Sequence, residues 1–203
     1  MSGTHAAVVL AAGGSRRLGR AKQLLTRGGE TLAHRAARLC AETSPRRLLV
    51  VVGAYREDVA QAVAGIGCEL VVNDEWERGL GSSLRTAAAA LVAHEGPTLI
   101  VACDQPALES AHLRRLLDGA AATGLGCAAT LHDGAPGIPA VLPPSWREHA
   151  GQLQGDQGMG RKLRELRADA VWTLDAPELG FDIDNDADLR VAIERGLLDD
   201  VSL

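Results

Sequence analysis

Aromatic residues are scarce in this chain, in which Phe, Tyr and Trp together make up 2% of 203 residues. Alanine, valine, leucine and isoleucine must fill the core, because hydrophobic residues still account for 46% of the sequence. The scarcity excludes an aromatic-rich β-sandwich. It also leaves no platform on which the bases of a single-stranded nucleic acid could stack.

An excess of positive charge is missing as well, since 21 basic residues stand against 26 acidic ones and give a formal net charge of −5. A mildly acidic surface repels phosphate backbones, so we expect no nucleic-acid partner. Any anionic ligand must therefore be held by a local basic site.

Paired cysteines, paired histidines and long apolar runs are absent too. The four cysteines lack a CxxC spacing, which argues against a zinc ribbon and a disulfide framework, and we expect reduced, mostly buried thiols at Cys40, Cys68, Cys103 and Cys127. Neither HxxxH nor GxSxG occurs, so a histidine metal site and a serine hydrolase are not expected. No segment resembles a complete signal peptide or could span a bilayer, so we expect a cytoplasmic protein without a membrane partner.

Short apolar segments alternate with helical patterns in the first half of the chain. Strands are predicted at 6–12, 47–52, 69–72 and 98–103, and helices at 31–42, 57–64, 82–93 and 110–122. Continuously apolar strands are typical of a parallel sheet that is buried on both faces. The alternation predicts an open α/β sheet, in which ligands bind beyond the carboxyl ends of the strands.

The second half of the chain is less regular. Strands at 126–132 and 137–142 flank a turn-rich segment, which predicts a hairpin or sheet-edge excursion and hence a mixed sheet. Helices are predicted at 145–150 and 159–167, and a last short strand at 181–184 precedes a helix from 186 to about 195. Because we find no repeat and no convincing linker, we expect a single domain over residues 1–203.

A glycine-rich, basic segment follows the first predicted strand. Its glycines can turn backbone N–H groups into a concavity that suits an anion. Four cations surround them, namely Arg16, Arg17, Arg20 and Lys22. Together these groups suit a nucleoside triphosphate, because cations can neutralise a pyrophosphate leaving group. The spacing matches neither the P-loop nor the dinucleotide fingerprint. Taken alone, the segment is equally well explained as a glycine turn with a solvated basic face.

Carboxylates stand at two places that could face this basic segment. Asp104 directly follows the fourth predicted strand, and alternation on the last predicted strand puts Asp182 and Asp184 on one face. Mg²⁺ favours one or two carboxylates together with waters and substrate phosphates. Asp104 and Asp184 are therefore candidate ligands, although helix capping is the commoner role for an acidic cluster taken by itself.

Two further glycine turns precede predicted helices. After Gly81, Ser82 and Ser83 open a helix whose unpaired N–H groups could read the edge of a base or hold a phosphate, although plain capping serines are the commoner case. The other turn, 155–160, leads to Arg161 at the start of a helix.

Together these residues resemble the MobA-like nucleotidyltransferase family, and most of all its molybdenum cofactor cytidylyltransferase branch. The strings that carry the resemblance are LAAGGSRRLGRAKQLL at 10–25, NDEWERGLGSSL at 73–84, CDQP at 103–106, GIP at 137–139, GDQG at 155–158 and DIDNDADL at 182–189. They follow one another in order over nearly the whole chain.

The resemblance implies a three-layer αβα fold with a Rossmann-like, mixed and mainly parallel sheet of the nucleotide-diphospho-sugar transferase type. The implied reaction is the Mg²⁺-dependent transfer of a nucleoside monophosphate, usually CMP from CTP, to the terminal phosphate of molybdopterin, with release of pyrophosphate. A molybdenum hydroxylase could receive the product. A phosphate acceptor is already ionised at neutral pH, so the reaction needs no general base.

The resemblance also implies roles for individual residues. Nucleotide binding falls to Ala11, Ala12, Gly13, Gly14, Ser15, Arg16, Arg17, Lys22, Asn73, Gly81, Ser82 and Ser83. The catalytic residues are Arg16, Lys22 and Asp104, and the metal ligands are Asp104 and Asp184 with Asp182 as a third. Acceptor binding falls to Gly137, Pro139, Gly155, Asp156 and Arg161.

This chain departs from the family pattern mainly on the acceptor side. The family often has GDxGAR and GHP where this chain has GDQGMGR and GIP, so that Arg161 is shifted by one position and Ile138 removes a polar contact. Leu18 and Leu80 replace the more usual Met. The alternatives are a sugar- or polyol-phosphate nucleotidylyltransferase, a guanylyltransferase of the same family, and a non-catalytic nucleotide-binding protein that delivers a cofactor.

Overall fold

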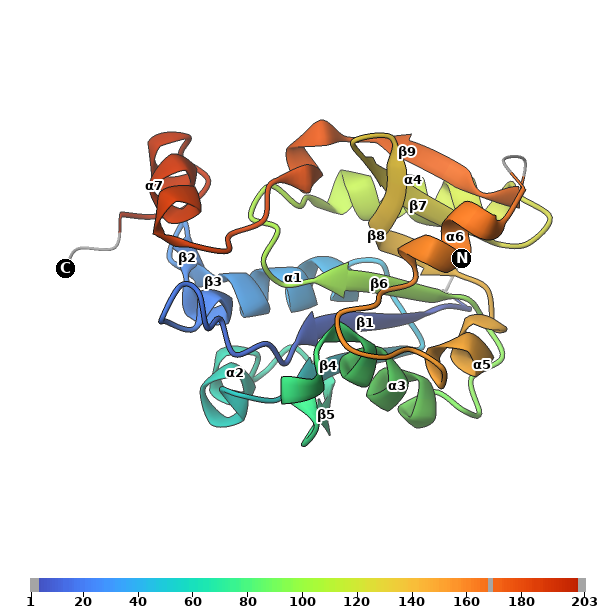
Figure 1. Cartoon of the computed structure of the whole chain (residues 1–203), viewed down its shortest axis with the longest axis horizontal. Coiled ribbons are helices and arrows are strands. Elements are labelled where there is room, and N and C mark those ends of the chain that lie inside the picture. The colour runs from blue at the N-terminus through green and yellow to red at the C-terminus, as the bar shows by residue number, and fades with distance from the viewer. Residues whose placement is uncertain (1–3, 168–169, 201–203) are drawn as a thin grey trace.

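The computed structural model describes residues 4–167 and 170–200; residues 168–169 and the ends of the expected domain, 1–3 and 201–203, lie outside this part. The strands of the main sheet are β1 (Ala6–Ala11), β4 (Arg47–Val52), β5 (Glu69–Val72), β6 (Thr98–Ala102), β7 (Ala128–His132), β8 (Ala135–Leu142) and β9 (Trp172–Asp175). They form one seven-stranded sheet in the order β5-β4-β1-β6-β8-β7-β9 (Figure 1). A separate ribbon pairs β2 (Thr26–Arg27) with β3 (Glu30–Thr31).

The sheet is mixed and mainly parallel. Strands β5, β4, β1 and β6 run parallel, β8 is antiparallel to both β6 and β7, and β9 is parallel to β7. Leu10 and Ala102 are partners in the register of β1 and β6. The loops that follow these two strands therefore leave the sheet at the same edge, where α/β folds bind ligands.

Helices cover both faces of the sheet and complete the three layers. One face carries α1 (Leu32–Ala41), α2 (Arg56–Ala62) and α4 (Ser110–Ala121), and the other α3 (Leu80–Ala90), α5 (Trp146–Ala150) and α6 (Gly160–Glu165). Strand β1 is apolar throughout because it is buried on both sides: Ala7 and Val9 pack into one core cluster and Val8 into the other. The predicted three-layer α/β fold with a mixed sheet is confirmed.

A third, smaller cluster lies at the left of Figure 1, where α7 (Asp186–Glu194) packs beside β2 and β3. Its apolar members include Leu18 from the glycine-rich loop and Ile183 from the segment that leads into α7. The C-terminal helix thus brings the acidic segment at 182–184 next to the loop that follows β1.

The strand predicted at 181–184 is wrong. These residues form no strand, because Ile183 is completely buried in the third cluster and draws the segment away from the sheet. The edge position belongs to β9, where Leu174 is fully buried and the backbone pairs with β7. The other predicted strands, the β7–β8 hairpin and the helices are present, with ends shifted by up to three residues.

The cysteines match the expectation of unpaired, mostly buried thiols. All four cysteines are free, and Cys40, Cys103 and Cys127 are buried while Cys68 is half-buried. In the part of the chain that the structure describes, none of the helices combines the length and the apolar character needed to cross a bilayer.

Candidate functional site

The glycine-rich loop that follows β1 is held in place by hydrogen bonds from a buried glutamine. Gln23 is 1% exposed, and its Nε2 donates hydrogen bonds to the carbonyl oxygens of Ala11 at 3.0 Å and Gly13 at 2.6 Å. The backbone N–H of Lys22 also donates to Ser15 Oγ at 3.2 Å. Ser15 itself has a positive φ of 48°, a conformation that these contacts help to hold. These hydrogen bonds therefore fix the backbone of the loop, while the side chains of Arg16 and Arg17 stay exposed to solvent.

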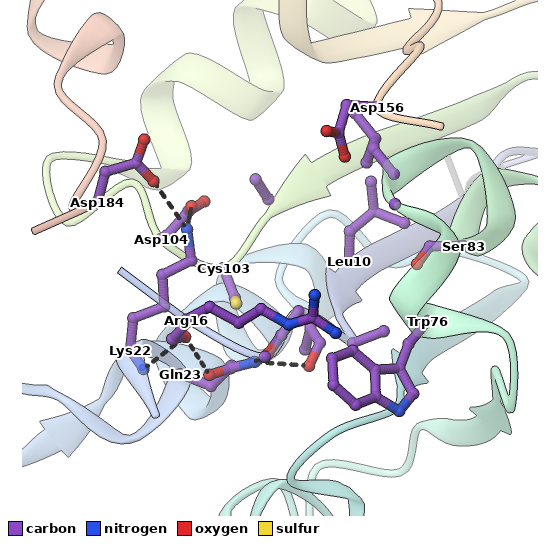
Figure 2. Close-up of a pocket in the computed structure, with 18 of the residues that line it drawn as sticks. Leu10, Arg16, Lys22, Gln23, Trp76, Ser83, Cys103, Asp104, Asp156 and Asp184 are labelled. Atoms are coloured by element: carbon purple, nitrogen blue, oxygen red, sulfur yellow. Dashed lines mark hydrogen bonds and ion pairs between the residues drawn. The ribbon is translucent and has the colours of Figure 1, made fainter. Parts of the chain in front are cut away.

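This loop forms one wall of a pocket of about 430 Å³ (Figure 2). The predicted site residues that line it are Ala11, Ala12, Gly13, Gly14, Ser15, Arg16, Arg17, Lys22, Ser83, Asp104, Asp156 and Asp184. They come from the segments that follow β1 and β6, from the start of α3, from the 151–159 loop and from the segment before α7. Five stretches that are distant in sequence thus meet in one cavity.

Lys22 lies between two carboxylates of this pocket. Its Nζ pairs with Asp104 Oδ2 and lies 3.5 Å from Asp184 Oδ1, as Figure 2 shows. Arg17 Nη2 lies 2.8 Å from Asp184 Oδ2. Burial alone would lower the pKa of Lys22, but the charge and the hydrogen bond of Asp104, together with Cys103 and the charge of Asp184, outweigh burial, and the pKa of Lys22 is raised. The ammonium therefore stays charged at neutral pH.

The two carboxylates fit a divalent cation. The ammonium of Lys22 already interacts with both Asp104 and Asp184, so their oxygens converge on a place where positive charge is stable. Within residues 4–167 and 170–200, no cluster of three or more His, Cys, Asp or Glu side chains could hold a metal by itself. Mg²⁺ suits this arrangement, because it takes one or two carboxylates and completes its shell with waters and phosphates.

Asp182 differs from these two carboxylates. It does not line the pocket. The pKa of Asp182 is raised to about 7, first because its carboxyl group loses hydration and second because the negative charge of Asp104 is near. We predict that Asp182→Asn retains Mg²⁺-dependent nucleotide binding, whereas Asp104→Asn weakens it at least 10-fold. Calorimetric titration of each variant with nucleotide and MgCl₂ measures this, and equal losses in both would contradict the assignment.

Asn73 and Ser82 hold the nucleotide-side segment together instead of lining the pocket. Asn73 is 2% exposed, and its Nδ2 donates to Ser82 Oγ at 2.8 Å and to Ser83 Oγ at 3.1 Å. Its Oδ1 accepts a hydrogen bond from the N–H of Glu75 at 3.0 Å. Of the three polar side chains predicted here, only Ser83 lines the cavity.

The predicted nucleotide and acceptor segments touch each other directly. The N–H of Gly81 donates to the carbonyl oxygen of Gly155 at 2.9 Å. A Cβ atom at Gly79, which has a φ of +86°, would collide with Asp156 Oδ1 and with the backbone of Gly155. Only glycine allows this approach, so the start of α3 and the 151–159 loop are packed as one unit.

A second cavity of about 670 Å³ adjoins the first and shares Leu10 and Leu80 with it. Its walls are mainly apolar and include Leu84, Ile100, Ile138, Leu142, Leu153 and Met159. Its polar residues are His149, Gln152, Gln157, Arg161, Lys162, Arg164 and Glu165. Of the predicted acceptor residues, Gly137 and Arg161 line this cavity. Pro139 does not line it, and its carbonyl oxygen accepts a hydrogen bond from Thr130 Oγ1 at 2.9 Å.

Sequence reasoning missed three polar or aromatic residues of the first pocket. Gln23, Trp76 and Glu77 all line it, and the latter two belong to the short 3-10 helix η2 (Trp76–Arg78). All three stand inside strings already singled out. The sequence does not reveal that the buried amide of Gln23 supports the loop, nor that Trp76 of η2 packs directly on Gly14 of the loop.

The geometry of this pocket agrees with the comparison of the chain with known families. The MobA-like NTP transferase domain matches residues 7–171. The chain belongs to this family. The expected family resemblance is thereby confirmed, and the chain is a nucleotidyltransferase in this broad sense.

Individual relatives share part of the chain. GlmU from Corynebacterium diphtheriae is 37% identical over 127 residues, which is 58% of this chain and 26% of that protein. This chain thus matches only about a quarter of the length of GlmU. Nicotine blue oxidoreductase from Paenarthrobacter nicotinovorans is 38% identical over 112 residues, which is 54% of each chain.

Solved structures match over nearly the whole length. Rv0371c from Mycobacterium tuberculosis H37Rv superimposes with a TM-score of 0.81 and 28% identity over 96% of this chain and 99% of its own, and it has also been crystallised with manganese. Molybdopterin-guanine dinucleotide biosynthesis protein A from Archaeoglobus fulgidus gives a TM-score of 0.66 at 20% identity, with 94% and 98% of the chains covered. That likeness concerns the fold alone.

Proposed function

We propose that the protein is a Mg²⁺-dependent nucleotidyltransferase that transfers a nucleoside monophosphate to the terminal phosphate of a molybdopterin-type acceptor. The preferred donor is CTP, from which CMP is transferred. The observation that carries the proposal is the first pocket. It combines a braced glycine loop and its cations with two carboxylates that converge on Lys22. A triphosphate needs such cations, and a Mg²⁺ ion that accompanies it needs such carboxylates.

The reaction is an in-line displacement at the α-phosphorus. An oxygen of the acceptor phosphate forms a new bond to this atom, and the bond to the oxygen that bridges the α- and β-phosphorus breaks, so that pyrophosphate leaves with the electron pair. The attacking phosphate is already ionised, so positioning and charge neutralisation by the loop and by Lys22 supply the catalysis. When bound, Mg²⁺ would neutralise phosphate charge beside Asp104 and Asp184.

The second cavity supports a bulky acceptor. It adjoins the first pocket at Leu10 and Leu80, so a molecule in it could extend a phosphate toward the nucleotide. Its apolar residues offer a surface on which a flat ring system can pack, and polar residues such as His149, Gln152 and Gln157 can form hydrogen bonds at the edge of the ring. Arg161 and Lys162 offer positive charge for an anionic group.

Nucleotide binding is tested by thermal unfolding with CTP, GTP, ATP and UTP, each with and without MgCl₂. At a hundredfold excess over Kd, a ligand adds about 2.7 kcal/mol to the free energy of unfolding. For a chain of this size we expect a shift of the midpoint by several degrees, largest for CTP and dependent on Mg²⁺. Equal shifts with all four nucleotides would contradict the preference for CTP.

The transfer itself is tested by pyrophosphate release and by analysis of the product. We expect release from CTP only when molybdopterin or its molybdenum form is present, and not with sugar or polyol phosphates. Release with a sugar phosphate would overturn the acceptor in favour of a sugar-phosphate nucleotidylyltransferase, and greater release from GTP would favour the guanylyl variant. Binding of nucleotide without release for any acceptor would favour a delivery protein.

A further inference from the structure

Arg16 of the glycine loop interacts with two residues of η2 that also line the first pocket. Its Cζ lies 5.6 Å from the centroid of the Trp76 ring, and its Nη2 lies 2.9 Å from Glu77 Oε1. Figure 2 shows the side chain extended toward the indole of Trp76. One aromatic face and one carboxylate, both from η2, therefore hold this guanidinium at the pocket.

The Trp76 ring is fixed by the backbone around it. A Cβ atom on Gly14 would lie 2.5 Å from Cζ3 of Trp76, and one on Gly53 would lie 2.7 Å from the Cβ of Trp76. The indole thus packs directly on two glycines and against an apolar core cluster. The two charged side chains are much freer, with 69% of the Arg16 and 64% of the Glu77 side chain exposed. The ring is a fixed support, whereas the ion pair can exchange.

The two contacts of Arg16 use different parts of the guanidinium. An aromatic ring attracts its flat face, whereas carboxylates and phosphates accept hydrogen bonds from the N–H groups at its edge. A phosphate can therefore replace Glu77 while the face stays in contact with Trp76. An exposed ion pair contributes little, and a phosphate carries more negative charge than the carboxylate that it would replace.

From this geometry we propose that Trp76 is a positioning residue that holds Arg16 over the nucleotide pocket, and that Glu77 is the resting partner which a nucleotide phosphate displaces. The inference rests on the proposed function, because it requires a triphosphate in the first pocket. It assigns opposite effects to two neighbouring residues. Trp76 assists binding of the triphosphate, and Glu77 competes with it.

The test measures the Kd and KM of the triphosphate that stabilises the wild-type protein most. We expect Trp76→Leu to raise Kd about 3- to 5-fold, and Trp76→Phe, which keeps an aromatic face, to restore most of the affinity. Glu77→Gln lowers Kd about 2- to 5-fold, more at low salt than at high salt. In the Arg16→Ala background both changes disappear, because both act through this side chain. KM follows Kd, and kcat changes less.

Glu69→Gln is the matched control. The Arg47–Glu69 pair is also an arginine–glutamate pair at the surface, with an Nη2–Oε2 distance of 2.7 Å and with 33% of the Arg47 and 51% of the Glu69 side chain exposed. It lies outside the pocket, so the Kd should not change. Should Trp76→Leu fail to fold, Glu77→Gln in the wild-type and Arg16→Ala backgrounds still tests whether a phosphate displaces Glu77 from Arg16.

Two outcomes overturn the inference while leaving the proposed function intact. In the first, the wild type binds a triphosphate but Glu77→Gln does not tighten binding. In the second, the effects of either residue persist without Arg16. If the wild type binds no triphosphate at all, the proposed function and this inference fall together.

Discussion

Replacing Lys22 by methionine should abolish nucleotidyl transfer and at the same time destabilise the protein. The ammonium of Lys22 interacts with both Asp104 and Asp184, and the Lys22 side chain is only 18% exposed. Without it, kcat/KM should fall about 10²- to 10³-fold, as happens when one charge-stabilising group is removed from an active site. The two remaining carboxylates would repel each other in a partly buried place, and we expect a loss of about 2 kcal/mol in the free energy of unfolding.

The same variant should respond more strongly to divalent cations than the wild type. Because Lys22 no longer competes for Asp104 and Asp184, MgCl₂ alone should raise the unfolding midpoint of Lys22→Met more than that of the wild type, without restoring activity. Differential scanning calorimetry with and without MgCl₂ measures this response. Arg115→Met, which removes a cation from the exposed surface of α4, should change neither the activity nor the response to Mg²⁺.

A Lys22→Met variant with wild-type turnover would exclude this residue from the reaction. A variant that is inactive but no more responsive to Mg²⁺ than the wild type would show that the carboxylates are not the metal site. The two readouts therefore separate the role of Lys22 from that of the acids around it.

The middle of the sheet could be predicted from sequence because β1, β4 and β6 are buried almost throughout. In β1 every residue from Ala6 to Ala11 is buried, so the apolar run and the strand coincide. The glycine loop was also predictable, since it joins this strand to a run of cations. Both features depend on residues that are close in sequence. In a parallel sheet, the loop that follows a strand then lies at the carboxyl edge, where ligands bind.

The acidic segment before α7 shows what local patterns miss. The residues at 181–184 alternate like a strand, but Ile183 packs with Leu18 and Leu189 away from the sheet. The alternation placed Asp182 and Asp184 on one face of a strand, whereas in the structure only Asp184 of these two lines the pocket. That distinction depends on packing between distant segments, which a single sequence does not display.

The 73–84 segment shows the same limit. Its polar residues suggested direct contacts with a base, but Asn73 uses both ends of its amide on Ser82, Ser83 and the N–H of Glu75. The residue that contacts the loop instead is Trp76. Its side chain fits there only because Gly14 and Gly53 have no side chains. Sequence identifies the segment, and tertiary packing decides which side chains face the cavity.

Gln23→Met should weaken nucleotide binding by the glycine loop, although it removes none of the cations that would neutralise the phosphates. The amide of Gln23 is buried, and its Nε2 is the donor to both Ala11 and Gly13. Methionine has a similar length but no N–H, so these carbonyl oxygens would lose this partner. An unpaired buried polar group costs about 1–3 kcal/mol, and we expect a loss of about 2 kcal/mol in the free energy of unfolding.

The loop should then lose the shape that presents its backbone to phosphate, so the Kd for nucleotide should rise at least 10-fold. Gln61→Met, on the exposed side of α2, is the matched control and should leave both the stability and the Kd unchanged. Chemical denaturation and calorimetric titration measure the two quantities. Gln23→Met with normal stability and normal affinity would mean that the loop keeps its shape without the amide. In that case backbone conformation, and not the buried glutamine, forms the phosphate site.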